Sequence, residues 1–301
     1  MLSQLVDSYL ELRRATGFRM KVPGYLLPSF ANFAAARGES WVCTRTAIDW
    51  AALAPSERQR ANRLGMLRMF ARFARAEDPR HEVPPSRVFV APRVHYAPFV
   101  FSQGLVTALV KRAAQLTPAG SLRPWTFCTL FSLLAVTGMR ISEALALRIK
   151  DITPDGIVIR EAKFRKSRLV PLHPTATDGL ARYLERRGAV ADDHVFISVH
   201  GTGLPYSTVI ATFLRLVRAM GIHPGPGHQG PRIHDLRHGF AVRVLEGCPN
   251  QSHVVDARML ALSTYMGHAR LDSTYWYLHA TPQLLTQISD ACEHFVDGAG
   301  R

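Results

Sequence analysis

A proline-rich stretch divides this chain of 301 residues into two parts that cannot form one continuous helical array. Residues 79–98 read PRHEVPPSRVFVAPRVHYAP and contain five prolines. Proline lacks the backbone N–H and its ring clashes with the preceding helical turn, so helices stop here and the backbone becomes extended. The sequence therefore predicts a first domain at residues 1–82, a linker at 83–97 and a second domain at 98–301.

The first domain is expected to be helical. Apolar residues recur near the 3.6-residue helical period in residues 2–12, and again in the segment SERQRANRLGMLRMFARFARAED, where Ser56 is a typical N-cap residue. Three arginines of this segment, Arg68, Arg72 and Arg75, fall on one helix face. Such a face is either solvated or laid along a nucleic-acid backbone.

The second domain is expected to be mostly helical with a small antiparallel β-sheet. Helical periodicity marks residues 102–115, 124–136, the segment ISEALALRIKDI, and much of the chain after residue 175. Between these helices, the short β-branched runs GIVIR and RLVPL flank the polar segment EAKFRKS, a pattern typical of a hairpin or small meander. The stretch HPGPGHQGP is a loop by composition. The whole chain is therefore predicted to be mainly α with a small sheet.

The charge of the chain indicates a nucleic-acid partner. The formal net charge is +14, and the excess is spread evenly: residues 1–97 hold 15 basic and 8 acidic side chains, and residues 98–301 hold 22 and 15. Arginine, the better bidentate partner for phosphate, far outnumbers lysine. An even basic excess favours a protein that contacts DNA through both of its domains.

Other features of the composition favour a cytoplasmic protein. No run of about 18 apolar residues is present, so no membrane span is expected. The N-terminal segment carries acidic residues early and lacks the apolar core of a signal peptide. The four cysteines form no CxxC pair and are expected to be reduced thiols.

The segment HDLRH at residues 234–238 has two chemical interpretations. His234 and His238 stand at i and i+4, a spacing at which two imidazoles on one helix face bind zinc. Against zinc, Asp235 is shorter than the glutamate of HExxH enzymes, Arg237 would repel the dication, and no motif supplies a third ligand. His234 and Arg237, at i and i+3, would instead contact a phosphate. The phosphate interpretation is favoured, and no metal or cofactor is expected.

Two further segments carry residues suited to phosphate chemistry. In VTGMRISEALAL, Arg140 opens a helix whose first N–H groups also favour an anion. In YMGHARLDSTYWYLH, His268 follows a helix break and precedes Tyr275 and Tyr277. A tyrosine can act as a covalent nucleophile on a phosphodiester. Taken singly, these residues are more typical of a surface arginine and of core aromatic side chains.

Together, the segments resemble the tyrosine recombinases, also called the phage integrase family. The match comprises Arg140, Lys163 in AKFRKSRLVPL, the pair His234 and Arg237, His268, and Tyr277, which stands nine residues after His268. Their order is intact over residues 137–279. Tyr275 stands two residues early and is the less favoured nucleophile. The resemblance adds that the N-terminal helices form a core-binding domain and that residues 98–301 form the α+β catalytic domain.

The resemblance implies a site-specific DNA recombinase of a mobile element, acting in integration, excision or transposition. Arg140, His234, Arg237 and His268 would contact the scissile phosphate, and Tyr277 would attack it to form a 3′-phosphotyrosyl link. Lys163 would protonate the leaving 5′ oxygen. The family implies four protomers on two double-stranded DNA sites, with other recombinases as possible partners. The tail segment TPQLLTQISDACEHF would form a helix on its own domain or on a neighbouring protomer.

Three alternatives remain open at this point. A type IB topoisomerase-like enzyme would use the same chemistry, although the short chain and helical first domain favour the recombinase. A catalytically silent DNA-binding partner or regulator would be expected to lack a catalytic position, and all six are present. A zinc hydrolase is the remote alternative.

Overall fold

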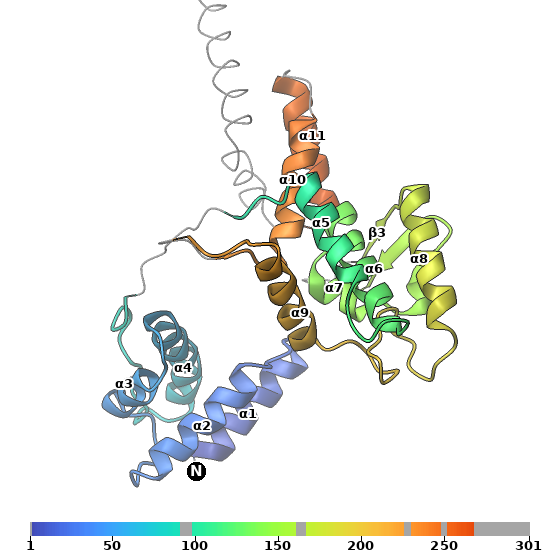
Figure 1. The fold of residues 1–301 in the computed structure, drawn as a ribbon. Helices are drawn as coiled ribbons and strands as arrows, with labels where there is room; N and C mark the ends of the chain where they lie inside the picture. Colours follow the sequence, from blue (N-terminus) through green and yellow to red (C-terminus); the bar gives the residue numbers. More distant parts are fainter. Residues whose placement is uncertain (1, 91–97, 161–166, 226–229, 248–251, 268–301) are drawn as a thin grey trace, which may run out of the picture. The chain divides into compact units, whose positions relative to one another are not determined.

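The computed structural model describes residues 2–90, 98–160, 167–225, 230–247 and 252–267 (Figure 1). The chain divides into two compact units, residues 1–95 and 96–301, each built around its own hydrophobic cores. Most described residues are helical, and the strands form one small antiparallel sheet, which confirms the predicted fold class. Within the described residues, no helix is long and apolar enough to cross a membrane.

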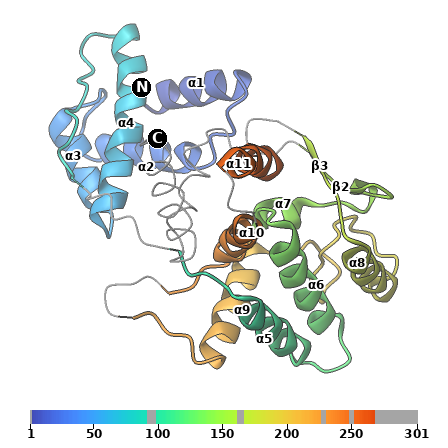
Figure 2. The same cartoon turned by 90° about the horizontal axis from the view of Figure 1, so that it is seen from above.

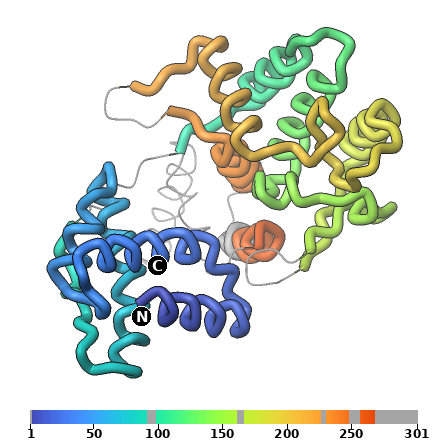
Figure 3. The backbone as a smooth tube through the Cα atoms, turned by 90° about the horizontal axis from the view of Figure 1, so that it is seen from below, coloured from blue at the N-terminus to red at the C-terminus, as the bar shows by residue number. Residues whose placement is uncertain are grey.

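The first unit consists of helices packed around one aromatic core. The helices are α1 (Leu2–Ala15), α2 (Pro23–Ala35), α3 (Thr44–Ala52) and α4 (Glu57–Glu77). The first two lie side by side in the tube drawing (Figure 3). Phe30 and Phe70 are fully buried, and the ring of Phe30 meets Trp50 edge to face. Ser56 caps α4 as predicted, because its hydroxyl accepts a hydrogen bond from the Gln59 N–H.

The first part of the predicted linker belongs to this unit. Phe89 packs against its core, and the buried His81 accepts a hydrogen bond from the Val42 N–H at 3.0 Å. The Pro84 carbonyl accepts a hydrogen bond of 2.7 Å from Arg68. Residues of the 83–90 part of the predicted linker thus pack against the first unit. An extended proline-rich backbone can lie along helices when side chains satisfy its carbonyl groups.

The second unit is organised around one central helix, α6 (Leu122–Thr137), which packs against α5 (Gln103–Ala114), α8 (Pro174–Arg187) and α10 (Asp235–Glu246). The remaining helices are α7 (Ile141–Ala146), α9 (Tyr206–Ala219) and α11 (Ser252–Met266). The apolar side chains of α6 are buried on several faces, as a helix at the centre of a core requires. These contacts make α6 the fixed element against which the neighbouring segments are placed.

The sheet is a meander in the order β1 (Ile152–Thr153), β2 (Gly156–Ile159), β3 (Arg168–Val170), with antiparallel pairs throughout. Ile157 pairs with Val170, and both side chains are buried in the core of the second unit. This confirms the meander predicted from GIVIR and RLVPL. The β2–β3 connection carries Lys163, which lies outside the described residues.

The predicted helix ISEALALRIKDI is wrong beyond its first half. α7 ends at Ala146, and a 3₁₀ turn at Ile149–Asp151 leads into β1. Backbone pairing with a distant loop replaces the helical bonds: the Val195 N–H donates to the Leu147 carbonyl at 2.8 Å. The Asp151 carboxylate also accepts from the Arg148 N–H at 3.0 Å. The apolar period was helical, but tertiary contacts gave the backbone groups other partners.

A glycine at the start of β2 allows the close approach of β2 and β3 to be tested. Gly156 has φ of +131°, and a Cβ there would lie 2.3 Å from the Val170 carbonyl oxygen. We expect Gly156→Ala to lower the free energy of unfolding by about 2 kcal/mol or more, because it adds both backbone strain and a clash. Denaturant unfolding followed by circular dichroism would measure the loss.

Gly179→Ala is the matched control. Gly179 lies in α8 with open space where its Cβ would be, and alanine is the better helix former there. We expect this variant to be at least as stable as the original protein. Equal unfolding free energies for the two variants would contradict the tight approach of β2 and β3.

Candidate active site

The structure describes three of the six predicted site residues, and it brings them together. Arg140 precedes α7, His234 precedes α10, and Arg237 lies in the first turn of α10. Helix α10 packs against α6 and α11, as the view from above shows (Figure 2). The other three predicted residues, Lys163, His268 and Tyr277, lie outside the described residues, as does Tyr275.

Arg237 joins the ends of two helices. Its side chain is buried; Nη1 donates to the Gly138 carbonyl at 2.6 Å and Nη2 to the Met266 carbonyl at 2.7 Å. These carbonyls lie at the C-terminal ends of α6 and α11, where helices leave acceptors without partners and the dipole is negative. The guanidinium therefore holds the ends of α6 and α11 against α10.

Arg140 occupies a defined position because α6 stops immediately before it. Gly138 ends α6 in the left-handed conformation, at φ of +59°, and Arg140 then becomes the N-cap of α7. The Glu143 carboxylate accepts from the backbone N–H and from Nη1 of Arg140, both at 2.8 Å. Nη2 of Arg140 donates to the Gly267 carbonyl at 3.1 Å. The guanidinium thus reaches the residue that precedes His268.

The start of α7 favours an anion less strongly than the sequence suggested. α7 has only six residues, so its dipole is small, and Glu143 places a negative charge in its first turn. The positive charge of this region therefore comes mainly from guanidinium groups. Arg168 on β3 is one of them: it donates to both oxygens of the Glu143 carboxylate at 3.0 and 2.8 Å.

His234 is an exposed residue among positive charges. The surrounding protein removes part of the water around the imidazole, and this desolvation is the main reason that its pKa falls to about 4. The charges of Arg237 and Arg232 also lower the pKa. Arg140 adds to this effect, while Glu143 opposes it. The imidazole is therefore neutral near pH 7 and able to accept a proton. The same cluster of charges favours an anion beside His234.

The HDLRH segment shows no third metal ligand in the part of the chain that the structure describes. The rings of His234 and His238 meet edge to face, with centroids 4.8 Å apart. Asp235 is buried, and its carboxylate stabilises the turn that precedes α10. It accepts from the Arg232 N–H at 2.8 Å and from the Arg232 guanidinium at 3.2 Å. The cations Arg237 and Arg232 beside His234 favour an anion over a metal ion at this segment.

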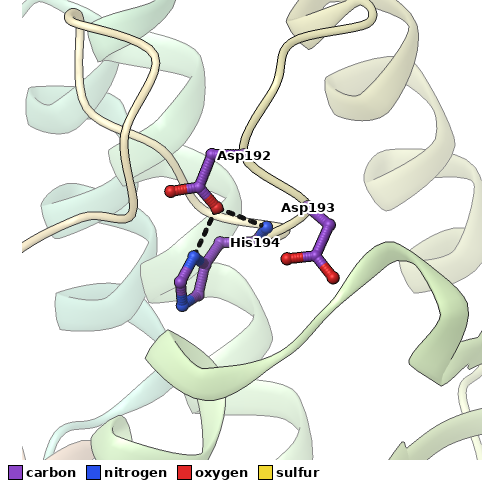
Figure 4. Close-up of side chains that lie close together, drawn as sticks. All are labelled: Asp192, Asp193 and His194. Atoms are coloured by element: carbon purple, nitrogen blue, oxygen red, sulfur yellow. Dashed lines mark hydrogen bonds and ion pairs between the residues drawn. The ribbon is translucent and has the colours of Figure 1, made fainter.

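One cluster of potential metal ligands does occur among the described residues, and it includes no residue of the HDLRH segment. Asp192, Asp193 and His194 offer ligand atoms within 4.8 Å of one another (Figure 4). Asp192 accepts from the backbone N–H and Nδ1 of His194 and from the Gly203 N–H. The Arg148 guanidinium pairs with Asp193. These bonds engage both carboxylates and hold the 192–194 loop beside Arg148, which gives the cluster a structural role.

The sequence analysis missed Glu143 and Arg168. Glu143 stands three residues after Arg140, the spacing at which an N3 glutamate caps a helix start. Arg168 is the first residue of the RLVPL run and gave no signal of its own, because its partner is distant in sequence. Burial raises the pKa of Glu143, but hydrogen bonds from Arg168 and Arg140 outweigh burial and lower it to about 2. The carboxylate is therefore charged at neutral pH.

Comparison with known proteins identifies the family. Residues 108–283 match the phage integrase family. The putative integrase/recombinase y4rB of Sinorhizobium fredii is 36% identical over 298 residues, which is 94% of each chain. The chain belongs to the phage integrase family. It is a site-specific DNA recombinase, an enzyme that cleaves and rejoins DNA strands, as the intact order of its six motif residues implied.

More distant comparisons agree with this assignment. The recombinase is 26% identical to the tyrosine recombinase XerD of Lacticaseibacillus casei over 75% of this chain and 73% of the other. Its fold is similar to that of a lambda integrase tetramer bound to a Holliday junction, with a TM-score of 0.65 and 17% identity, over 92% of this chain and 76% of the other. The roles of individual residues stay predictions.

The ionisation of His234 can be measured directly. We expect an NMR titration of its imidazole to give a pKa near 4, and Arg232→Met to raise that pKa because one neighbouring cation is removed. Since the folded protein would bind this proton more weakly than the unfolded chain, stability falls as the pH decreases from about 6.5 toward 4. An ordinary pKa, unchanged by Arg232→Met, would contradict the cationic site.

Proposed function

We propose that this recombinase cuts DNA by forming a 3′-phosphotyrosyl bond at Tyr277, without a metal or cofactor. One observation carries the proposal: Arg237 and Arg140 bind the carbonyls of the consecutive residues Met266 and Gly267. Two guanidiniums therefore meet the chain where it enters the segment that contains His268 and Tyr277. Tyr277 stands ten residues beyond Gly267.

The proposed reaction balances without an outside energy source. The phenolic oxygen of Tyr277 attacks the scissile phosphorus, an O–P bond forms, and the bond to the 5′ oxygen breaks. Negative charge on the non-bridging oxygens is stabilised by Arg140 and Arg237, with His268 as a further donor. A free 5′ hydroxyl of another strand then attacks the phosphotyrosine and releases the enzyme.

Two residues would move the protons. His234 takes the phenolic proton, a role supported by its neutral imidazole at pH 7. Lys163 gives a proton to the leaving 5′ oxygen; it belongs to the connection between β2 and β3, whose strands are fixed in the core of this unit. A long side chain on such a connection suits a general acid that must reach the leaving group.

The proposed partner is double-stranded DNA carrying specific recombination sites. Exchange between two sites requires four protomers, and the solved lambda integrase is a tetramer on a Holliday junction. Such a protein would act in the cytoplasm at the nucleoid, in integration, excision or transposition of a mobile element, alone or with other recombinases. The tail segment TPQLLTQISDACEHF would dock on its own domain or on a neighbouring protomer.

The first unit would supply part of the DNA contact. On α4, Arg72 and Arg75 are exposed, whereas Arg68 is partly buried and bonded to the Pro84 carbonyl. The three arginines predicted on one face therefore divide into one structural residue and two candidates for phosphate contact.

The nucleophile can be tested with a suicide duplex made from the DNA that flanks the gene. In EDTA, we expect the original protein to form a covalent adduct on a denaturing gel, and Tyr277→Phe to bind the duplex without forming one. Tyr275→Phe is the matched control and should still form the adduct. Adducts that depend on Tyr275, or that require added metal, would contradict the mechanism.

The same assay separates the alternatives. A catalytically silent DNA-binding partner would bind the duplex and form no adduct even with Tyr277 present. A type IB topoisomerase-like enzyme would relax plasmids that lack the recombination site. Site-dependent adducts that lead to strand exchange support the recombinase.

The DNA contact of α4 can be tested through salt dependence. We expect the double variant Arg72→Ser, Arg75→Ser to bind DNA more weakly and to reduce the slope of log K against log salt by about 0.9 for each lost phosphate contact. Arg37→Ser is the matched control, because its guanidinium is paired with Asp49 at 2.7 Å. Equal slopes for all three proteins would contradict a role of α4 in DNA binding.

A further inference from the structure

The two guanidiniums that share Glu143 come from different elements. Arg168 lies on β3 with only 14% of its side chain exposed, and it donates to both oxygens of the Glu143 carboxylate. Arg140 donates to the same carboxylate from the start of α7. The Glu143 side chain is 6% exposed, so these three charges interact with little screening by water.

Arg140, Glu143 and Arg168 form one charged group, and its net charge depends on Arg168. Glu143 carries one negative charge, and the two arginines carry two positive charges, so the group keeps one net positive charge. Without Arg168, the carboxylate would face Arg140 alone, and the pair would be neutral. An approaching phosphate would then meet a guanidinium whose charge is already compensated.

The position of the group ties it to the proposed reaction. A Cβ at Gly267 would lie 3.2 Å from Nη1 of Arg168 and 3.8 Å from Nη1 of Arg140. Gly267 has φ of +65° and directly precedes His268. Both guanidiniums therefore border the backbone at which the catalytic segment begins.

We propose that Arg168 is a positioning residue that keeps Arg140 available for the scissile phosphate by compensating the charge of Glu143. This inference rests on the proposed function. Arg168 itself need not touch the DNA. It acts through the carboxylate, and it couples the strand that follows the Lys163 connection to the arginine at the start of α7.

A double-mutant cycle tests the proposal. We expect Arg168→Met to lower the single-turnover cleavage rate of the suicide duplex by about tenfold to a hundredfold, less than the loss from removing a contacting donor such as Arg140. Glu143→Gln in the Arg168→Met background should restore part of the rate, because the uncompensated charge is gone. A residue that served only the packing of β3 would give no such recovery.

Arg160→Met is the matched control for the change in net charge. Arg160 directly follows β2, pairs with Asp151 and has a side chain that is 57% exposed. We expect it to cleave at close to the original rate. Thermal unfolding and DNA binding are measured for every variant, and if Arg168→Met does not fold, Arg168→Gln with and without Glu143→Gln takes its place.

The outcomes separate two failures. Absence of an adduct from the original protein contradicts the proposed function. An original protein that cleaves, together with an unaffected Arg168 variant or a double variant no faster than the single one, contradicts the positioning role alone. A slow single variant and a faster double variant support it.

Discussion

The second unit depends on one buried guanidinium. Arg237 on α10 donates to carbonyls at the ends of α6 and α11, so three helices meet at a single side chain. Leaving either buried carbonyl without its donor costs about 1–3 kcal/mol. Because the α6 end leads to Arg140 and the α11 end leads to His268, the same bonds that stabilise the fold also set where the site begins. Stability and function are joined at this point.

Among the described residues, arginines outnumber carboxylates around the site, and this sets its electrostatics. Glu143 is buried between Arg140 and Arg168, and Asp235 is buried beneath Arg232. Each carboxylate holds an arginine in place. Around His234, however, the cations Arg237, Arg232 and Arg140 outnumber the carboxylates. Desolvation of the imidazole lowers its pKa, the neighbouring cations lower it further, and the region is suited to an anion. This charge pattern is stronger support for phosphate chemistry than the net charge of the whole chain.

The sequence predicted most of the fold and part of the site. Helical periodicity and the cap at Ser56 located α4, and the β-branched runs located the meander. The predicted helix over ISEALALRIKDI was wrong in its second half, because α7 stops at Ala146 where the Leu147 carbonyl accepts from the Val195 N–H. The sequence also gave no sign that Val83 and Phe89 pack against the core of the first unit. Such pairings have no local signal, since each partner satisfies a backbone group of the other.

For the site, the sequence by itself determined the family, through the order of Arg140, Lys163, His234, Arg237, His268 and Tyr277. It could not show that Glu143 links Arg140 to Arg168, because 25 residues separate that carboxylate from its partner on β3. Only the tertiary structure decided that Arg237 is buried, that His234 is exposed among cations, and that Glu143 is shared. Motif order reflects chemistry that must be present, whereas burial and charge pairing arise only when distant elements pack together.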